Sequence, residues 1–558
     1  MHIRSTLLAF AVVGAGLLLP VGAATADSEL LELKNTILSL VDQLVQKGVI
    51  SAEEADAMKR QAAVKAREES AQAGVAAGGA AAAASGAAGT GVVRVPYVPE
   101  FVKDEIRAEV REELRQDVTN DVVAVAKAEK WGTADALPDW LSRIEVSGDF
   151  RLRFSGLYQP SSNNPAVPDF QSINEAGGAA AAGDSVFLNT TNDINQGQVR
   201  LRLGTTAAVT DDFLVVTRLA TGNDINPTTR NQRLGTYNQP FDIFVDLAYG
   251  EWRPGDPSEY GAYTVRGGRL PNPFVTTSLL FDEDLTFDGV TGSYRLDAFG
   301  RDEAFFVNLG GFALLAESPN LIDGGANDKY WWGTQVGLEL DLTEDLGLMF
   351  LGSYYGFVNV VGQRNDFNST SKDWTAPAFI AKGNTVFDIR NDLDPDTQLF
   401  ALASDFELVN AMVELAYRGF SPIDVALRLD YVENIGFDAG EVQARVGTSV
   451  NERNQGWFAQ LEVGSPEVRE RGQWQLFAGY RSLDRDAVLD SFTDSDFHAG
   501  GTDAEGWLFG GYYGFASNLW LRARWLSADE IDGAPAGFAD PFTPLAIDVL
   551  QVDLNARF

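Results

Sequence analysis

The sequence of 558 residues contains no cysteine and only two histidines, His2 and His498. Without cysteine there can be no disulfide framework, no thiolate nucleophile and no cysteine-ligated metal. Neither histidine belongs to a Ser-His-Asp set or a zinc motif, and the sequence carries no phosphate loop or dinucleotide fingerprint. These absences argue against an enzyme and give no reason to expect a cofactor or a metal site.

Positive charge is also scarce, since 43 Lys and Arg stand against 79 Asp and Glu, giving a formal net charge of −36. Phosphate binding needs a basic surface, so nucleic acid is not an expected partner. No stretch approaches the roughly 20 apolar residues of a membrane-spanning helix. The apolar run from Leu7 to Leu19 is followed by Ala24-Thr25-Ala26, so residues 1–26 are predicted to be a cleaved signal peptide.

Helical and flexible segments are predicted before residue 141. Apolar residues at spacings of three and four, together with a capping box at Ser51-Ala52-Glu53-Glu54, predict a helical hairpin over 27–70. Residues 71–91 are almost entirely Ala, Gly and Ser, as in a flexible linker. Residues 92–140 contain an amphipathic helix and a connector. This helix is expected in the periplasm, where it forms a coiled coil, caps or plugs the barrel, or packs on a neighbouring surface.

The sequence is rich in glycine and aromatic residues, with 55 Gly, 34 Phe, 15 Tyr and 11 Trp. From Ile144 onward, apolar and polar residues alternate with a period of two; Leu152 and Phe154, for example, oppose Arg151 and Arg153. Alternation of this kind is typical of strands with lipid outside and water inside. We therefore predict that residues 141–558 form an all-β, antiparallel transmembrane barrel in the outer membrane.

The final strand shows the pattern most clearly. Its apolar face carries Leu550, Val552, Leu554, Ala556 and Phe558, and its polar face carries Gln551, Asp553, Asn555 and Arg557. The terminal Phe558 resembles the signature by which bacterial outer-membrane barrels are recognised for insertion. Outer-membrane lipid and the barrel-assembly machinery are therefore expected partners.

Connection lengths predict the number of strands. Short links such as Thr210-Asp211 and Thr343-Glu344 alternate with long ones, as periplasmic turns alternate with external loops in barrels. Two segments, Gln398 to Leu408 and Met412 to Phe420, compete for one spanning position. If only the second spans, the barrel has sixteen strands, and eighteen would require a further hairpin. The segment Phe305 to Leu315 is apolar on both faces and cannot be oriented.

Three stretches resemble the Putative porin family of diderm bacteria: residues 44–54 (Leu-Val-Gln-Lys-Gly-Val-Ile-Ser-Ala-Glu-Glu), residues 94–103 (Arg-Val-Pro-Tyr-Val-Pro-Glu-Phe-Val-Lys) and residues 138–153. The resemblance implies an outer-membrane channel and, by similarity with other sixteen-stranded porins, a homotrimer. The resemblance does not identify the solute that the channel carries. General porins begin their barrel almost directly after the signal peptide and carry a Pro-Glu-Phe-Gly constriction motif, and this sequence does neither.

Function in a conduit depends on the charges that line it. The inward positions of the predicted strands carry basic residues, namely Arg151, Arg153, Arg200, Arg202, Arg428, Arg481, Arg522 and Arg524. Guanidinium groups stay charged at any relevant pH, so they would impose a positive field on the lumen. Alternatively, they pair with neighbouring acids and stabilise the wall. The first view predicts a mild preference for anions despite the acidic composition.

The link from Arg269 to Asp284, called here the third loop, is the predicted constriction. In sixteen-stranded porins the corresponding external loop commonly folds inward. Here Pro271 and Pro273 stiffen it, Phe274 is an apolar residue that can pack on the wall, and Asp282, Glu283 and Asp284 supply charge. The acids could instead bind Ca²⁺ or lie in an ordinary solvated loop. The predicted function is passive diffusion of small hydrophilic solutes or ions; the alternative is an envelope-tethering barrel whose N-terminal helices bind a periplasmic or cell-wall partner.

Overall fold

The computed structural model describes residues 143–558 except 223–225, 256–260, 299–302, 317–327 and 533–544. The predicted signal peptide (1–26), helical hairpin (27–70), linker (71–91) and amphipathic helix with its connector (92–140) lie outside the described residues. Within the part described, no helix is long and apolar enough to cross a membrane.

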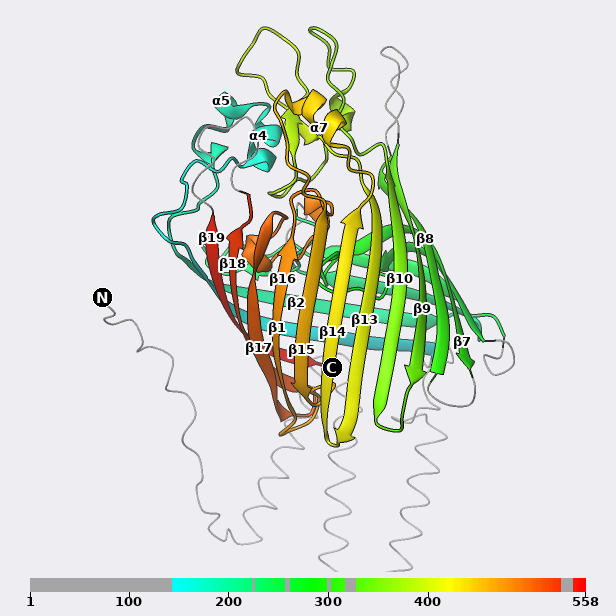
Figure 1. Cartoon of the computed structure of the whole chain (residues 1–558). Coiled ribbons are helices and arrows are strands. Elements are labelled where there is room, and N and C mark those ends of the chain that lie inside the picture. Colours follow the sequence, from blue (N-terminus) through cyan, green and yellow to red (C-terminus); the bar gives the residue numbers. More distant parts are fainter. Residues whose placement is uncertain (1–142, 223–225, 256–260, 299–302, 317–327, 533–544) are drawn as a thin grey trace, which may run out of the picture. The chain divides into compact units, whose positions relative to one another are not determined.

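Sixteen antiparallel strands close into a barrel (Figure 1). Neighbours along the chain pair with each other, and the last strand pairs with the first. The spanning strands are β1 (Ile144–Tyr158), β2 (Ile194–Ala208), β3 (Phe213–Ala220), β5 (Phe244–Trp252), β6 (Ala262–Pro271), β7 (Thr286–Ala298), β8 (Glu303–Leu315), β9 (Lys329–Asp341), β10 (Leu346–Val358), β13 (Glu407–Phe420), β14 (Ile423–Asn434), β15 (Gln455–Gly464), β16 (Trp474–Leu483), β17 (Ala504–Ala516), β18 (Leu519–Glu530) and β19 (Ala546–Arg557).

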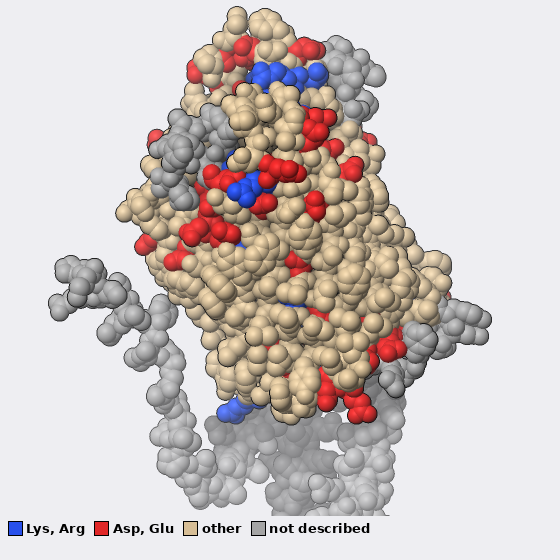
Figure 2. Space-filling model, viewed as in Figure 1, with Lys and Arg blue, Asp and Glu red and all other residues tan. Residues whose placement is uncertain are grey.

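The closing register shows which face is outside. Leu152 of β1 lies opposite Leu554 of β19, and these side chains are 42% and 37% exposed. One position along, Arg153 lies opposite Asp553, and both are almost completely buried. Because successive side chains alternate between the two faces of a strand, the leucines face lipid and the charged pair faces the lumen. The middle of the visible barrel surface is accordingly almost uncharged (Figure 2).

The competition between the two candidate segments is resolved in favour of sixteen strands. The spanning strand is β13, which contains the whole of the segment Met412 to Phe420. The segment from Gln398 contributes β12 (Phe400–Leu402), which pairs with β11 (Val386–Asp388) in a small separate hairpin. β4 (Gln232–Arg233) is a two-residue extension that pairs with β2. Eighteen strands are therefore excluded.

The segment that sequence alone could not orient is β8. Phe306 and Phe312 are 5% and 3% exposed, whereas Leu309 of the opposite face is 51% exposed. Leu309 therefore faces lipid. The inner face is apolar as well because it packs against protein rather than against water. Phe312 packs against Phe274 of the third loop, and Phe306 packs against Leu351 and Met412 of the inner wall.

The long links gather at one end of the barrel, and the short turns lie at the other (Figure 1). The long links contain the short helices α4 (Phe170–Ala176), α5 (Ala179–Ala182) and α7 (Ala439–Val446). They also contain four 3₁₀ turns, namely η4 (Gly183–Val186), η5 (Asp373–Thr375), η6 (Asp490–Phe492) and η7 (Phe497–Ala499). Two of the long links, the third loop and the loop 484–503, carry acids that contact arginines of the inner wall. A third, between β3 and β5, reaches the same place, where the main-chain N–H of Arg230 donates to Asp284 at 3.3 Å.

Candidate pore constriction

The third loop lies against the inner wall of β7 to β10 through its apolar side chains. Phe274, Leu279, Leu280 and Phe281 are each no more than 5% exposed. The Phe281 ring lies 5.8 Å from that of Trp331, which stacks on other aromatic rings of the wall. Burying aromatic side chains in this way contributes strongly to stability. The loop therefore has a packed core of its own inside the barrel.

The acids of the third loop reach the opposite wall. Asp284 accepts a hydrogen bond from Arg200 of β2 at 2.7 Å and another from Arg202 at 3.3 Å. Glu283 forms an ion pair with Arg151 of β1 at 3.2 Å and lies 4.0 Å from Arg522 of β18. The acidic run of the third loop, which was expected to face the arginine rows, thus contacts arginines of β1 and β2.

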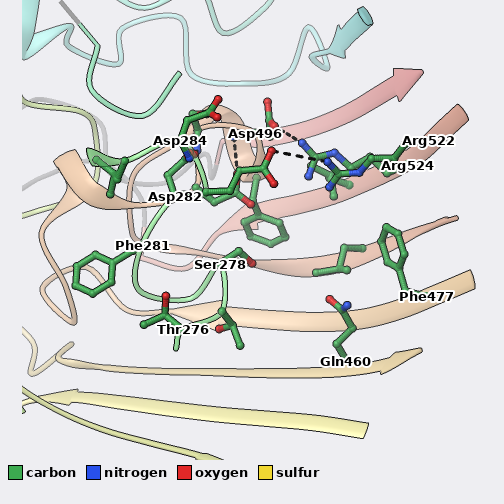
Figure 3. Close-up of a pocket in the computed structure, with 18 of the residues that line it drawn as sticks. Thr276, Ser278, Phe281, Asp282, Asp284, Gln460, Phe477, Asp496, Arg522 and Arg524 are labelled. Atoms are coloured by element: carbon green, nitrogen blue, oxygen red, sulfur yellow. Dashed lines mark hydrogen bonds and ion pairs between the residues drawn. The ribbon is translucent and has the colours of Figure 1, made fainter. Parts of the chain in front are cut away.

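A second loop contributes to the same site. Asp496, in the loop 484–503, accepts hydrogen bonds from Arg153 and Arg524, and from the amide of Gln551 at 2.7 Å (Figure 3). Sequence reasoning missed this loop. Its signal was the same as that of the third loop, because Val488, Leu489 and Phe497 are apolar residues in an external link, and all three are buried.

Asp282 connects the two loops. Its main-chain N–H donates to the carbonyl of Phe492 at 2.9 Å, and its carboxylate accepts from the N–H of Ser495 at 2.8 Å. Burial, reinforced by the negative charges of Asp494 and Asp284, raises the pKa of Asp282 well above its ordinary value. The loops are therefore joined through a carboxyl group that favours the protonated form.

The two acids that contact arginines behave in the opposite way. Enclosure within the barrel would raise the pKa of Glu283, but the positive field of Arg151, Arg522 and Arg200 outweighs it and holds the pKa well below the ordinary value. Arg153 and Arg524 outweigh burial in the same manner and lower the pKa of Asp496. Both side chains therefore remain ionised at neutral pH.

Of the other predicted basic residues, Arg428 pairs with Glu414 and, at 3.4 Å, with Glu462 on the lumen side of β13 to β15. Arg481 of β16 is 1% exposed, and its guanidinium lies 4.9 Å from the ring centre of Phe497. Its Nε and Nη1 have no hydrogen-bond partner among the described residues. Within the described residues, neither arginine forms an ion pair with Asp282, Glu283 or Asp284.

The start of the third loop differs from the rest. Arg269 and Pro271 are still part of β6, and Pro273 is half-buried just beyond the strand. Arg269 forms an ion pair with Asp288 at 3.1 Å, on the opposite face of β6 from the fully buried Leu270. It is therefore not among the arginines that contact the acidic run.

Phe558 follows β19 and continues its pairing. Its main-chain N–H and carbonyl form hydrogen bonds with Gly148 of β1 at 3.0 and 2.7 Å. Its side chain is 63% exposed. The terminal aromatic group thus lies at the seam where the barrel closes.

The two loops and the wall enclose a charged cavity of about 440 Å³. Glu283, Asp284 and Arg151 line this cavity and also a smaller one of about 190 Å³ beside Asp149 and Arg202. In the described part of the chain, no group of three or more His, Asp or Glu side chains could hold a metal ion. The cavity therefore presents charged groups and hydrogen-bond partners to a small polar molecule.

A closed barrel of sixteen antiparallel strands with a charged interior and a lipid-facing exterior defines an outer-membrane β-barrel of the porin class. The family model described as Putative porin matches residues 34–558, so the chain belongs to this family.

Three solved structures of porins are similar to this chain at 11% sequence identity. They are Pseudomonas putida OprB at high pH (TM-score 0.41, covering 77% of this chain and 97% of that one), Salmonella typhi OmpF in complex with daunomycin (0.37, 74% and 97%) and an anion-selective porin from Comamonas acidovorans (0.37, 74% and 99%). No curated protein matches the sequence.

Proposed function

We propose that this protein is a porin that forms a water-filled channel for passive diffusion of small hydrophilic solutes or ions. The observation that carries the proposal is the third loop, which crosses the lumen from an aromatic wall to an arginine wall. Its acids line two cavities that meet at Arg151, Glu283 and Asp284. Polar cavities on the two sides of a charged segment are what a selective pore needs.

The same site supports a mild preference for anions. Six arginines gather on β1, β2 and β18, and the carboxylates in contact with them are Asp149, Glu283, Asp284, Asp496 and Asp553. This pairing leaves a small excess of positive charge at the constriction. Acids on the external loops add less to the field there, because charges beyond about 8 Å are screened at physiological salt. The two interpretations of the arginines, wall stabilisation and charge selection, are compatible.

Assembly follows the family resemblance. We expect a homotrimer in outer-membrane lipid, with the strand that ends at Phe558 presented to the barrel-assembly machinery. Tethering through the N-terminal helices remains the alternative; the residues that would carry it lie before the described part of the chain.

Single-channel recording in planar bilayers tests the channel and its constriction together. Deleting residues 275–281 should raise the conductance, because it removes Leu279, Leu280 and Phe281, which fix the loop to the wall. The matched control is deletion of residues 391–397, an equally long stretch around the exposed Leu393 in the external link between β11 and β12. That deletion should leave the conductance unchanged.

A point substitution controls for misassembly of the deletion variant. Phe281→Ala keeps the backbone of the third loop and removes one anchor, so it should give a smaller increase in conductance. If both third-loop variants conduct as the wild type does, the constriction lies elsewhere. If the inserted wild-type barrel carries no current, the proposed function is wrong.

A further inference from the structure

A second cavity of about 370 Å³ lies at the end of the barrel that carries the long links. Its wall is formed by the outer ends of β1, β2 and β19 together with segments near Phe379 to Lys382 and Asp490 to Gly501. Only Ser495 is shared with the larger cavity of the constriction. The larger cavity is lined by several ion pairs, whereas this one is lined about equally by apolar and by polar residues.

The cation of this cavity is Lys382. His498 holds the ammonium group of Lys382 in place. The orientation of the imidazole ring follows from its Nε2–H, which donates to the carbonyl oxygen of Leu545 at 2.9 Å. The other ring nitrogen, Nδ1, is then the acceptor for the ammonium group of Lys382, at 2.6 Å. An ammonium has three N–H donors, so this contact leaves donors to spare. Lys382 forms no ion pair with any residue in the described ranges.

The ammonium group of Lys382 is poorly solvated. Burial lowers the pKa of Lys382 to about 8, although Glu530 and Asp503 at longer range favour the charged form. The side chain is therefore mostly protonated at neutral pH. A half-buried cation that forms no direct ion pair favours binding of an anion that can accept its remaining hydrogen bonds.

The complementary group is Gln159, just beyond β1. The residue is 7% exposed, and its Oε1 has no hydrogen-bond partner in the part of the chain that the structure describes. Its main-chain N–H is already bonded to Asp193 at 2.9 Å. A buried amide oxygen without a donor is costly, and a ligand hydroxyl would satisfy it.

The remaining wall limits the size and polarity of a ligand. Leu157, Ile380 and Ile547 supply apolar surface, and the hydroxyl of Thr493 donates to the main chain at 2.9 Å. Asp490, also in the wall, has its pKa raised by burial to about 7, so it carries only part of a negative charge at neutral pH. The cavity therefore offers the cation Lys382, the free acceptor of Gln159 and an apolar surface. A carboxylate, Asp169, also lines it, and both of its oxygens accept hydrogen bonds from Ser172.

We propose that this cavity binds small hydroxycarboxylates, with the carboxylate on Lys382 and the hydroxyl donating to Gln159. The inference rests on the proposed function, because it gives the channel a solute-binding site at the end of the barrel that carries the long links. Lys382 and Gln159 would select solutes there, while His498 is a positioning residue that holds the ammonium group.

Isothermal titration calorimetry on the purified full-length protein tests the site without relying on conductance. The probes are lactate, its uncharged amide lactamide, and propanoate, which lacks the hydroxyl. Lactate should bind, and lactamide should bind roughly tenfold or more weakly because it lacks the charge that Lys382 recognises. Propanoate should bind less tightly than lactate by a smaller factor.

Three variants assign the contacts. Lys382→Gln should weaken lactate binding roughly tenfold or more, whereas Lys372→Gln, a partly exposed lysine of the same long link, should leave it unchanged. Gln159→Leu should remove the preference for lactate over propanoate. The probe comparison on the wild type still tests the site if a variant fails to fold.

Two results would overturn the inference: equal binding of lactate and lactamide by the wild type, or undiminished lactate binding by a folded Lys382→Gln. Absence of lactate binding in a protein that conducts would reject this site and leave the channel intact. Absence of conductance in a protein that binds lactate would reject the channel instead.

Discussion

The two sides of the lumen are stabilised in different ways. Along β7 to β10 the inward residues form an aromatic cluster that the third loop covers, together with the buried polar residues Asn308, Gln335 and Ser353. Along β1, β2, β18 and β19 the inward residues are charged, and they pair across neighbouring strands and with two loops. The outer face is apolar on both sides, so only the interior distinguishes them.

The difference shows how one loop can define a pore. The aromatic side fixes the loop by packing, which needs no partner of opposite charge. The arginine side receives the acids that the loop carries, and those acids set the local field. In the proposed channel, packing determines where the loop lies, and charge selects the solutes that pass beside it.

Truncating the centre of the aromatic side should have the largest effect. Trp331 is 1% exposed and stacks on Phe312 with ring centres 4.2 Å apart, so Trp331→Ala should lower the free energy of unfolding by about 3–5 kcal/mol. The next residue, Trp332, is 44% exposed on the lipid face and is the matched control. Trp332→Ala should cost much less in urea unfolding of the reconstituted protein. Equal losses would mean that the interior of this side is not a packed core.

A smaller effect should come from the carboxyl group that joins the two loops. Because the pKa of Asp282 is raised in the folded protein, its protonated form is favoured there. Its stabilising contribution is fully present below about pH 4, the ordinary range for aspartate, and is lost as the pH rises through the raised value. Asp282→Asn should remove this pH dependence.

The measurement for Asp282 is the unfolding midpoint of wild type and variant from about pH 4 to about pH 8. Asp394→Asn, a change in an external link away from the lumen, is the control and should follow the wild-type profile. A wild-type pH profile that Asp282→Asn leaves unaltered would show that another group carries the dependence.

Much of the barrel could be predicted because lipid imposes a regular pattern. Val552 and Leu554 alternate with Gln551 and Asp553, so the lipid-facing and lumen-facing sides of β19 can be predicted from the sequence. The faces of β8 could not be read in this way, because its inward residues do not contact water: Phe312 packs against the third loop and Phe306 against Leu351 and Met412 of the inner wall. The role of the loop 484–503 could not be predicted either. Its apolar residues can be read from the sequence, but no local pattern indicates that Asp496 contacts Arg153 and Arg524.

The most direct test of the account is the reversal potential of the purified channel in a KCl gradient. We predict a mild anion preference for the wild type and a shift toward cations in the double variant Arg200→Gln, Arg202→Gln, which leaves Asp149 and Asp284 without their partners. Arg469→Gln, in the turn between β15 and β16, should shift the potential little. A strong cation preference in the wild type, or equal shifts in the two variants, would contradict the assignment of selectivity to the arginine side.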